Sequence, residues 1–250
     1  MIDIEKCKEE FINYVKKYDL EKDGIKRKYE HSLRVMKNSK KLAKILNLNN
    51  EEIEVATLIG LLHDIGRFDE YSIKKDNNFD HGDHGVEILK KDNYILNYID
   101  NEKYIEIILK SIKNHDKLEI EKDLDEKTLM FCKLIRDSDK IDILYEGEYI
   151  YWNKKEEKEN VENTKFSKYM EKEFVKQKPI KRLSSIKNDT IDGLFMLLSY
   201  VYDINFKETL KIIEKENYIN KILDRFNFRD EITKEQVNKF KDILNKYIKG

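Results

Sequence analysis

The 250-residue sequence is poor in residues that interrupt helices: it contains one proline, Pro179, and eight glycines. Its apolar residues recur at intervals of three and four instead of alternating, which is the period of an amphipathic helix. We therefore predict an all-α fold. The expected helices cover residues 4–18, 26–46, 51–64, 82–92, 102–115, 126–148, 165–176, 189–202, 206–216 and 233–248.

Three further features are missing, and each absence argues against a class of protein. The two cysteines, Cys7 and Cys132, form no CxxC pair, which favours reduced thiols over a disulfide scaffold. The 49 basic and 50 acidic residues nearly cancel, so no strong positive field points to nucleic acid or to an anionic membrane. Residues 1–6 lack a signal-peptide pattern, and no apolar run reaches the ~18 residues of a membrane span. We expect a cytoplasmic protein.

A stretch rich in lysine and glutamate, residues 153–176, ends just before Pro179 and indicates a solvated connection or an exposed helix. It separates a first bundle from a C-terminal group of helices over residues 180–250. We therefore divide the chain into a first bundle, residues 1–150, and a C-terminal helical extension, residues 151–250, which we expect to pack on it. Within the extension, residues 195–202 are apolar nearly all round, which predicts a buried core helix. The alternative is an oligomer interface, which would make the protein a homodimer.

All five histidines lie within one third of the chain. Three of them lie at helical spacing from apolar residues of their own predicted helices: His31, His63 and His115. For His31 the stripe consists of Val35, Leu42 and Ile45, so we expect this side chain to face inward. Buried imidazoles need partners for their polar nitrogens. The clustering favours a bound metal, and the alternative is a set of separate core histidines.

The doublet His63-Asp64 ends an apolar helix and is followed at once by Ile65-Gly66. An ionised aspartate at this point would be near-buried and next to the negative end of the helix dipole, which is doubly unfavourable. A bound cation reverses that penalty. The alternative is that Asp64 is exposed on a turn made by Gly66.

The order of these residues resembles a known family. His31, the segment LLHDIG at 61–66 and the segment RDSDK at 136–140 are similar to the H…HD…D signature of the HD-domain superfamily of metal-dependent phosphohydrolases. The resemblance covers roughly residues 25–145 and implies an HD-domain helical bundle, here with additional C-terminal helices. Residues 81–89 and 112–115 also resemble elements of the five-histidine branch, which includes the symmetrical dinucleoside tetraphosphatases and binds two metals.

The resemblance implies a set of six metal ligands: His31, His63, Asp64, His81, His115 and Asp139. In this alignment His31, His63, Asp64 and Asp139 hold the first metal, and Asp64 bridges to a second metal held by His81 and His115. Periodicity alone does not choose between Asp137 and Asp139, because their helix is apolar on many sides. Nitrogen and oxygen ligands suit divalent ions, two per chain; we expect iron or manganese, with nickel, zinc or magnesium as alternatives.

Three other residues are candidates for catalysis. Arg67 and Lys140 are the cations adjacent in sequence to predicted ligands, and we expect them to hold phosphate; the alternative is solvation at the surface. His84 lies one helical turn after His81. It is expected to contact the substrate or the water between the metals, or else to support a ligand or lie at the surface.

The predicted function is hydrolysis of a nucleotide or another small phosphorylated metabolite, as a phosphomonoesterase or phosphodiesterase, by a metal-activated water. Two alternatives stay open: a mixed-valent diiron oxygenase, because some HD-type proteins with this ligand set are such enzymes, and a non-catalytic nucleotide sensor. The substrate itself is not predicted. Residues 150–250 have no counterpart in the tetraphosphatases, and the NHD segment at 114–116 replaces the HHE element of cyclic-di-GMP phosphodiesterases.

Overall fold

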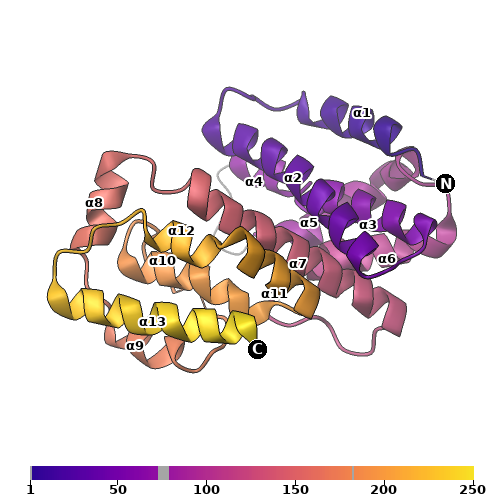
Figure 1. The fold of residues 1–250 in the computed structure, drawn as a ribbon. Helices are drawn as coiled ribbons and strands as arrows, with labels where there is room; N and C mark the ends of the chain where they lie inside the picture. Colours follow the sequence, from indigo (N-terminus) through magenta and orange to yellow (C-terminus); the bar gives the residue numbers. More distant parts are fainter. Residues whose placement is uncertain (1, 73–78, 182) are drawn as a thin grey trace. The chain divides into compact units, whose positions relative to one another are not determined.

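A computed structural model describes residues 2–72, 79–181 and 183–250 (Figure 1). Within these ranges the regular structure is α-helix with short 3-10 segments, and no strand occurs. The predicted all-α fold is confirmed. The chain divides into two compact units, Met1–Asp139 and Lys140–Gly250, and the boundary falls inside helix α7 (Glu126–Tyr149). The packing of residues 151–250 on the first bundle stays a prediction.

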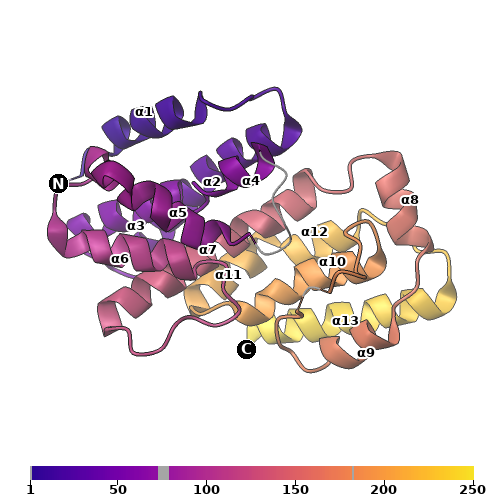
Figure 2. The ribbon, with the colours of Figure 1, turned by 180° about the vertical axis from the view of Figure 1, so that it is seen from behind.

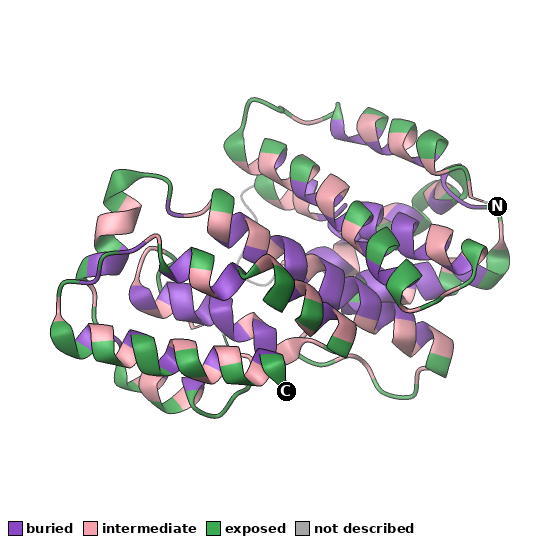
Figure 3. Ribbon diagram, viewed as in Figure 1, coloured by how far each residue is buried: buried purple, intermediate pink, exposed green. Residues whose placement is uncertain are grey.

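The first unit contains α1 (Ile4–Val15), α2 (Asp23–Ile45), α3 (Asn50–Leu62), α4 (Arg67–Ser72), α5 (His81–Lys90), the 3-10 segment η1 (Lys91–Asn97), α6 (Glu102–Asn114) and the first part of α7 (Figures 1 and 2). Helix α3 contacts α1, α2 and α6. It starts at a capping box formed by Asn49 and Glu52, and it is buried on every side over residues 55–62 (Figure 3). The residues that follow α3, His63 and Asp64, therefore emerge inside the core.

The second unit contains the rest of α7, α8 (Lys155–Asn163), α9 (Lys168–Phe174), α10 (Ile191–Leu198), the 3-10 segment η2 (Ser199–Asp203), α11 (Lys207–Glu216), α12 (Tyr218–Leu223) and α13 (Glu231–Lys249). Its core is rich in aromatic rings. Phe174 stacks on Phe240 with ring centroids 4.6 Å apart, and Phe195 lies edge-on to Phe174 at 5.2 Å. The predicted burial of residues 195–202 is confirmed for all but the partly exposed Tyr200.

The interpretation of residues 153–176 as a solvated connection or exposed helix is correct only in part, because the stretch is largely exposed but also contributes side chains to a core. Helices α8 and α9 cover most of it. Four of its side chains lie in the core of the second unit: Val161, Phe166, Met170 and Phe174. Met170 and Phe174 lie one turn apart on α9, and Phe166 lies just before that helix; the surrounding lysines and glutamates obscure this spacing in the sequence.

Among the described residues, no helix combines the length and the apolar character that a membrane span needs.

Candidate metal centre

Two histidines from different helices meet in the core of the first unit. His31 lies on α2 and His63 directly follows α3, and their Nε2 atoms are 3.2 Å apart. Oδ2 of Asp64 lies 3.4 Å from Nε2 of His31 and 3.5 Å from Nε2 of His63. The inward orientation predicted for His31 is confirmed, although Ile45 at the end of its stripe is exposed. These three buried residues can hold a metal ion.

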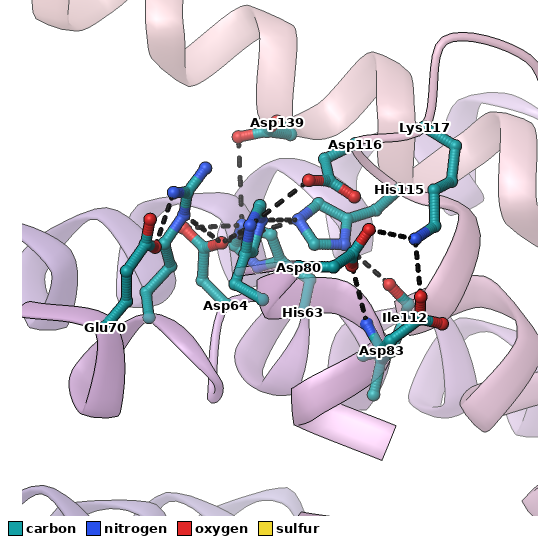
Figure 4. Close-up of polar contacts among 12 residues, drawn as sticks. His63, Asp64, Glu70, Asp80, Asp83, Ile112, His115, Asp116, Lys117 and Asp139 are labelled. Carbon is teal, nitrogen blue, oxygen red and sulfur yellow. Dashed lines mark hydrogen bonds and ion pairs between the residues drawn. The ribbon is translucent and has the colours of Figure 1, made fainter. Parts of the chain in front are cut away.

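A second pair of histidines contacts the other carboxylate oxygen of Asp64. His81 begins α5 and His115 directly follows α6, and their Nε2 atoms are 3.0 Å apart. Oδ1 of Asp64 is 3.4 Å from each of these two nitrogens. The two oxygens of one carboxylate thus face two different histidine pairs, and the second pair with Asp64 is again a group able to hold a metal ion. Figure 4 shows Asp64 with one histidine of each pair, His63 and His115.

Asp139, on α7, lies against the first histidine pair. Its Oδ1 is 3.1 Å from Nε2 of His31 and 3.7 Å from Nε2 of His63. This contact favours Asp139 over Asp137 as a ligand, a choice that periodicity leaves open. Burial opposes ionisation of Asp139, but the hydrogen bond with His31 holds its pKa below the usual range, so the carboxyl is ionised.

The donor atoms fit a metal ion because their lone pairs converge. Nδ1 of His63 and Nδ1 of His115 each donate to a main-chain carbonyl in the preceding helical turn, at 2.9 and 2.6 Å. Nδ1 of His81 lies 3.1 Å from a carboxylate oxygen of Asp116. With the proton on Nδ1, a neutral imidazole presents a lone pair at Nε2. Such lone pairs repel at the observed separations, and a cation between them removes the repulsion.

The protonation states agree with this fit. Burial lowers the pKa of His63 to about 4, and burial together with the nearby His115 holds the pKa of His81 far below its usual range. Both rings are therefore neutral at pH 7, the form that binds metals. Burial also opposes the charged form of His115, but its hydrogen bond to Asp64 raises the pKa above the usual value.

Lys28 is a contact of Asp64 that the sequence analysis missed. Its Nζ lies 2.7 Å from Oδ2 of Asp64, and its side chain is 13 % exposed. Burial would raise the pKa of Asp64, but Lys28 and the histidines hold it well below its usual range, so this carboxyl is ionised. Asp64 is buried, and the alternative of an exposed turn is wrong. The signal that could have found Lys28 is its position one helical turn before His31.

Arg67 reaches the same carboxylate from the turn after α3. Its Nε lies 3.6 Å from Oδ1 of Asp64, and its Nη1 lies 2.6 Å from Glu70. The side chain is 28 % exposed, so it borders both the centre and the solvent. This position agrees with the phosphate-holding role expected of Arg67, which stays a prediction.

The other two candidates contact carboxylates outside the ligand set. His84 is 2.6 Å from Asp69 through Nε2 and 3.1 Å from Glu87 through Nδ1, and it belongs to neither group of metal-binding residues. Lys140 belongs to the second unit, where it forms an ion pair with Asp203 at 2.7 Å. Direct roles of His84 and Lys140 in catalysis stay predictions.

Gly66 allows α5 to approach the turn that carries Asp64. A Cβ atom at Gly66 would lie 2.3 Å from the carbonyl oxygen of His81 and 2.8 Å from the amide nitrogen of Gly85. Both neighbours are backbone atoms, so a methyl group there must displace the start of α5. We predict that Gly66→Ala lowers the free energy of unfolding by about 3 kcal/mol, at the upper end of the usual cost of overpacking.

Urea unfolding in the presence of a chelator measures this loss, and Gly85→Ala is the matched control. A Cβ at Gly85 would lie 3.3 and 3.4 Å from two side-chain methyl groups and 3.6 Å from the amide nitrogen of Gly66, which is an ordinary contact distance. Alanine also favours a helix by about 0.5–1 kcal/mol. Gly85→Ala should therefore be close to neutral. Equal stability of the two variants would contradict the close approach at Gly66.

Comparison with protein families agrees with this geometry. Residues 29–147 match the family model of the HD domain. The matched range includes all six predicted ligands and extends from α2 to α7. The fold is an all-α HD-domain bundle with additional C-terminal helices, and the HD superfamily includes metal-dependent hydrolases. No significant match was found to a curated protein or to a solved structure.

Proposed function

We propose that this chain is a metal-dependent phosphohydrolase that acts on a nucleotide or another small phosphorylated metabolite through a metal-activated water. One observation carries the proposal. The two oxygens of Asp64 face different histidine pairs, each at 3.4–3.5 Å. This arrangement is what a carboxylate that bridges two ions needs.

In the proposed centre, the chain holds two divalent ions, with iron or manganese favoured by the mixed nitrogen and oxygen donors. His31, His63, Asp64 and Asp139 hold the first, and Asp64, His81 and His115 hold the second. When bound, such ions lower the pKa of water and neutralise the charge that develops on a phosphate during hydrolysis.

Two cations of the chain flank the bridging carboxylate and are proposed to orient the phosphate. The ammonium of Lys28 and the guanidinium of Arg67 both contact Asp64, from different helices. Their side chains keep some exposure to solvent, so an anion entering from solvent can reach them. The planar guanidinium can donate two parallel hydrogen bonds to one phosphate, whereas the ammonium acts as a point charge. His84, partly exposed one turn after His81, is proposed as a further substrate contact.

The test joins metal analysis of freshly purified protein to a hydrolysis screen over nucleotides, dinucleoside polyphosphates and cyclic dinucleotides. We expect release of phosphate or of a nucleotide product by iron- or manganese-loaded protein, and its loss on chelation. Bound iron with oxygen uptake and no hydrolysis would instead indicate the diiron oxygenase that shares this ligand set. Nucleotide binding without turnover in manganese-loaded protein would indicate a sensor.

A further inference from the structure

Among the predicted metal ligands, His81 differs from His63 and His115 in the partner of its Nδ1 atom. His63 and His115 lie at the C-terminal ends of helices, where each Nδ1 reaches the carbonyl oxygen three residues back, at 2.9 and 2.6 Å. His81 is the first residue of α5, so its own helix provides no preceding carbonyl. Its Nδ1 lies instead 3.1 Å from Oδ2 of Asp116, a carboxylate from the loop after α6.

The loop that carries Asp116 is fixed from two sides. Lys117 contacts Asp80, the N-cap residue of α5, and lies 2.8 Å from Asp83 in its first turn (Figure 4). From α7, the buried Arg136 donates to the carbonyl oxygen of Asn114 at 3.0 Å and to that of Lys117 at 2.5 Å. The loop therefore cannot move away from α5 without breaking several charged contacts.

The start of α5 also leaves room for this carboxylate. A Cβ atom at Gly82 would lie 3.1 Å from Oδ1 of Asp116 and 3.0 Å from the carbonyl oxygen of Lys113. The glycine after His81 thus lets the loop approach the helix end closely.

We propose that Asp116 is a positioning residue for the second metal position. Its carboxylate accepts a hydrogen bond from the Nδ1–H of His81, which fixes the tautomer with a free lone pair at Nε2 and turns that atom toward Asp64 and His115. A carboxylate partner also makes the imidazole a stronger donor than a carbonyl partner does. Metal binding at the second position therefore depends on Asp116, and binding at the first position does not. This inference rests on the proposed two-metal function.

The tautomer of His81 is the first test, and it needs no metal. In ¹⁵N spectra of the metal-free, full-length protein at mildly alkaline pH, we expect His81 to be protonated at Nδ1, with its signals assigned by comparison with His81→Gln. In Asp116→Ala the proton should move to Nε2, from which it can be donated in a hydrogen bond to Asp64. Glu119→Ala, which removes an exposed carboxylate from the same loop, should leave the tautomer unchanged. A wild-type His81 protonated at Nε2, or the same tautomer in Asp116→Ala, overturns the proposal.

Manganese titration followed by electron paramagnetic resonance is the second test. In Asp116→Ala the second equivalent of manganese should bind about 10–100-fold more weakly, as for other outer partners of metal-binding histidines, with the first equivalent unchanged. Asp116→Asn keeps a neutral acceptor and should fall between this variant and the wild type. Equal weakening of both equivalents, or of neither, contradicts the role of Asp116. A wild type that binds only one ion contradicts the two-metal function itself, and the tautomer measurement still decides the contact between Asp116 and His81.

Discussion

Asp64→Ala is expected to remove both metal ions and nearly all hydrolytic activity. One oxygen of this carboxylate contacts the first histidine pair and the other oxygen contacts the second pair. The substitution therefore removes a ligand from both proposed metal positions. It also leaves the histidine nitrogens without the negative charge that offsets two divalent cations. Elemental analysis of protein purified under metal-replete conditions should fall from about two ions per chain to near zero, with hydrolysis at background level.

Companion variants separate loss of the bridging ligand from loss of the folded structure. His63→Ala or Asp139→Ala should empty only the first position and keep a bound ion at the second. Asp64→Ala leaves the largely buried ammonium of Lys28 without its partner, so the double variant Asp64→Ala, Lys28→Met tests the same prediction without an unpaired charge. Circular dichroism with a chelator present checks that each variant is folded. A folded Asp64 variant that retains two ions would refute the bridging role.

The helices could be predicted from the sequence where their apolar stripes are long. The expected helices over 102–115 and 126–148 agree with α6 and α7 to within one residue at each end. The sequence analysis missed α4 and α12, which have six residues each and too few turns for a periodic signal. Helix α12 is separated from α11 by Asn217, which adopts a left-handed conformation with φ of 58°. Without glycine or proline at this break, the local sequence carries no strong signal for it.

Some residues of the candidate site can be predicted from the periodicity of the sequence, whereas others reach the site only through the tertiary packing of the fold. The inward orientation of His31 follows from its place on an apolar stripe, and the structure confirms it. The choice of Asp139 over Asp137 needed the family resemblance, because their helix is apolar on many sides. Lys28 and Asp116 were missed because each contacts its partner across the fold: Lys28 reaches Asp64 from another helix, and Asp116 approaches His81 from a loop.

The second large effect is expected for His115→Ala and His81→Ala, which remove ligands from one position only. Each should leave about one ion per chain, because the first group of ligands stays complete. The rate of hydrolysis should fall by several orders of magnitude, since one of two ions that stabilise charge on the phosphate is missing. His115→Ala is the cleaner test, because His81 also contacts Asp116 and removing His81 would leave that carboxylate without this contact.

The competing arrangement is a mononuclear HD site in which His81 and His115 contact the substrate directly. In that case the wild type would hold one ion, and His115→Ala would hold the same number while binding substrate more weakly. Elemental analysis of the wild type and His115→Ala side by side decides between the two arrangements. The same stoichiometry, near one, in both proteins would reject the dinuclear assignment. It would remove the two-metal form of the proposal and leave hydrolysis at a single ion, which His31, His63, Asp64 and Asp139 would hold.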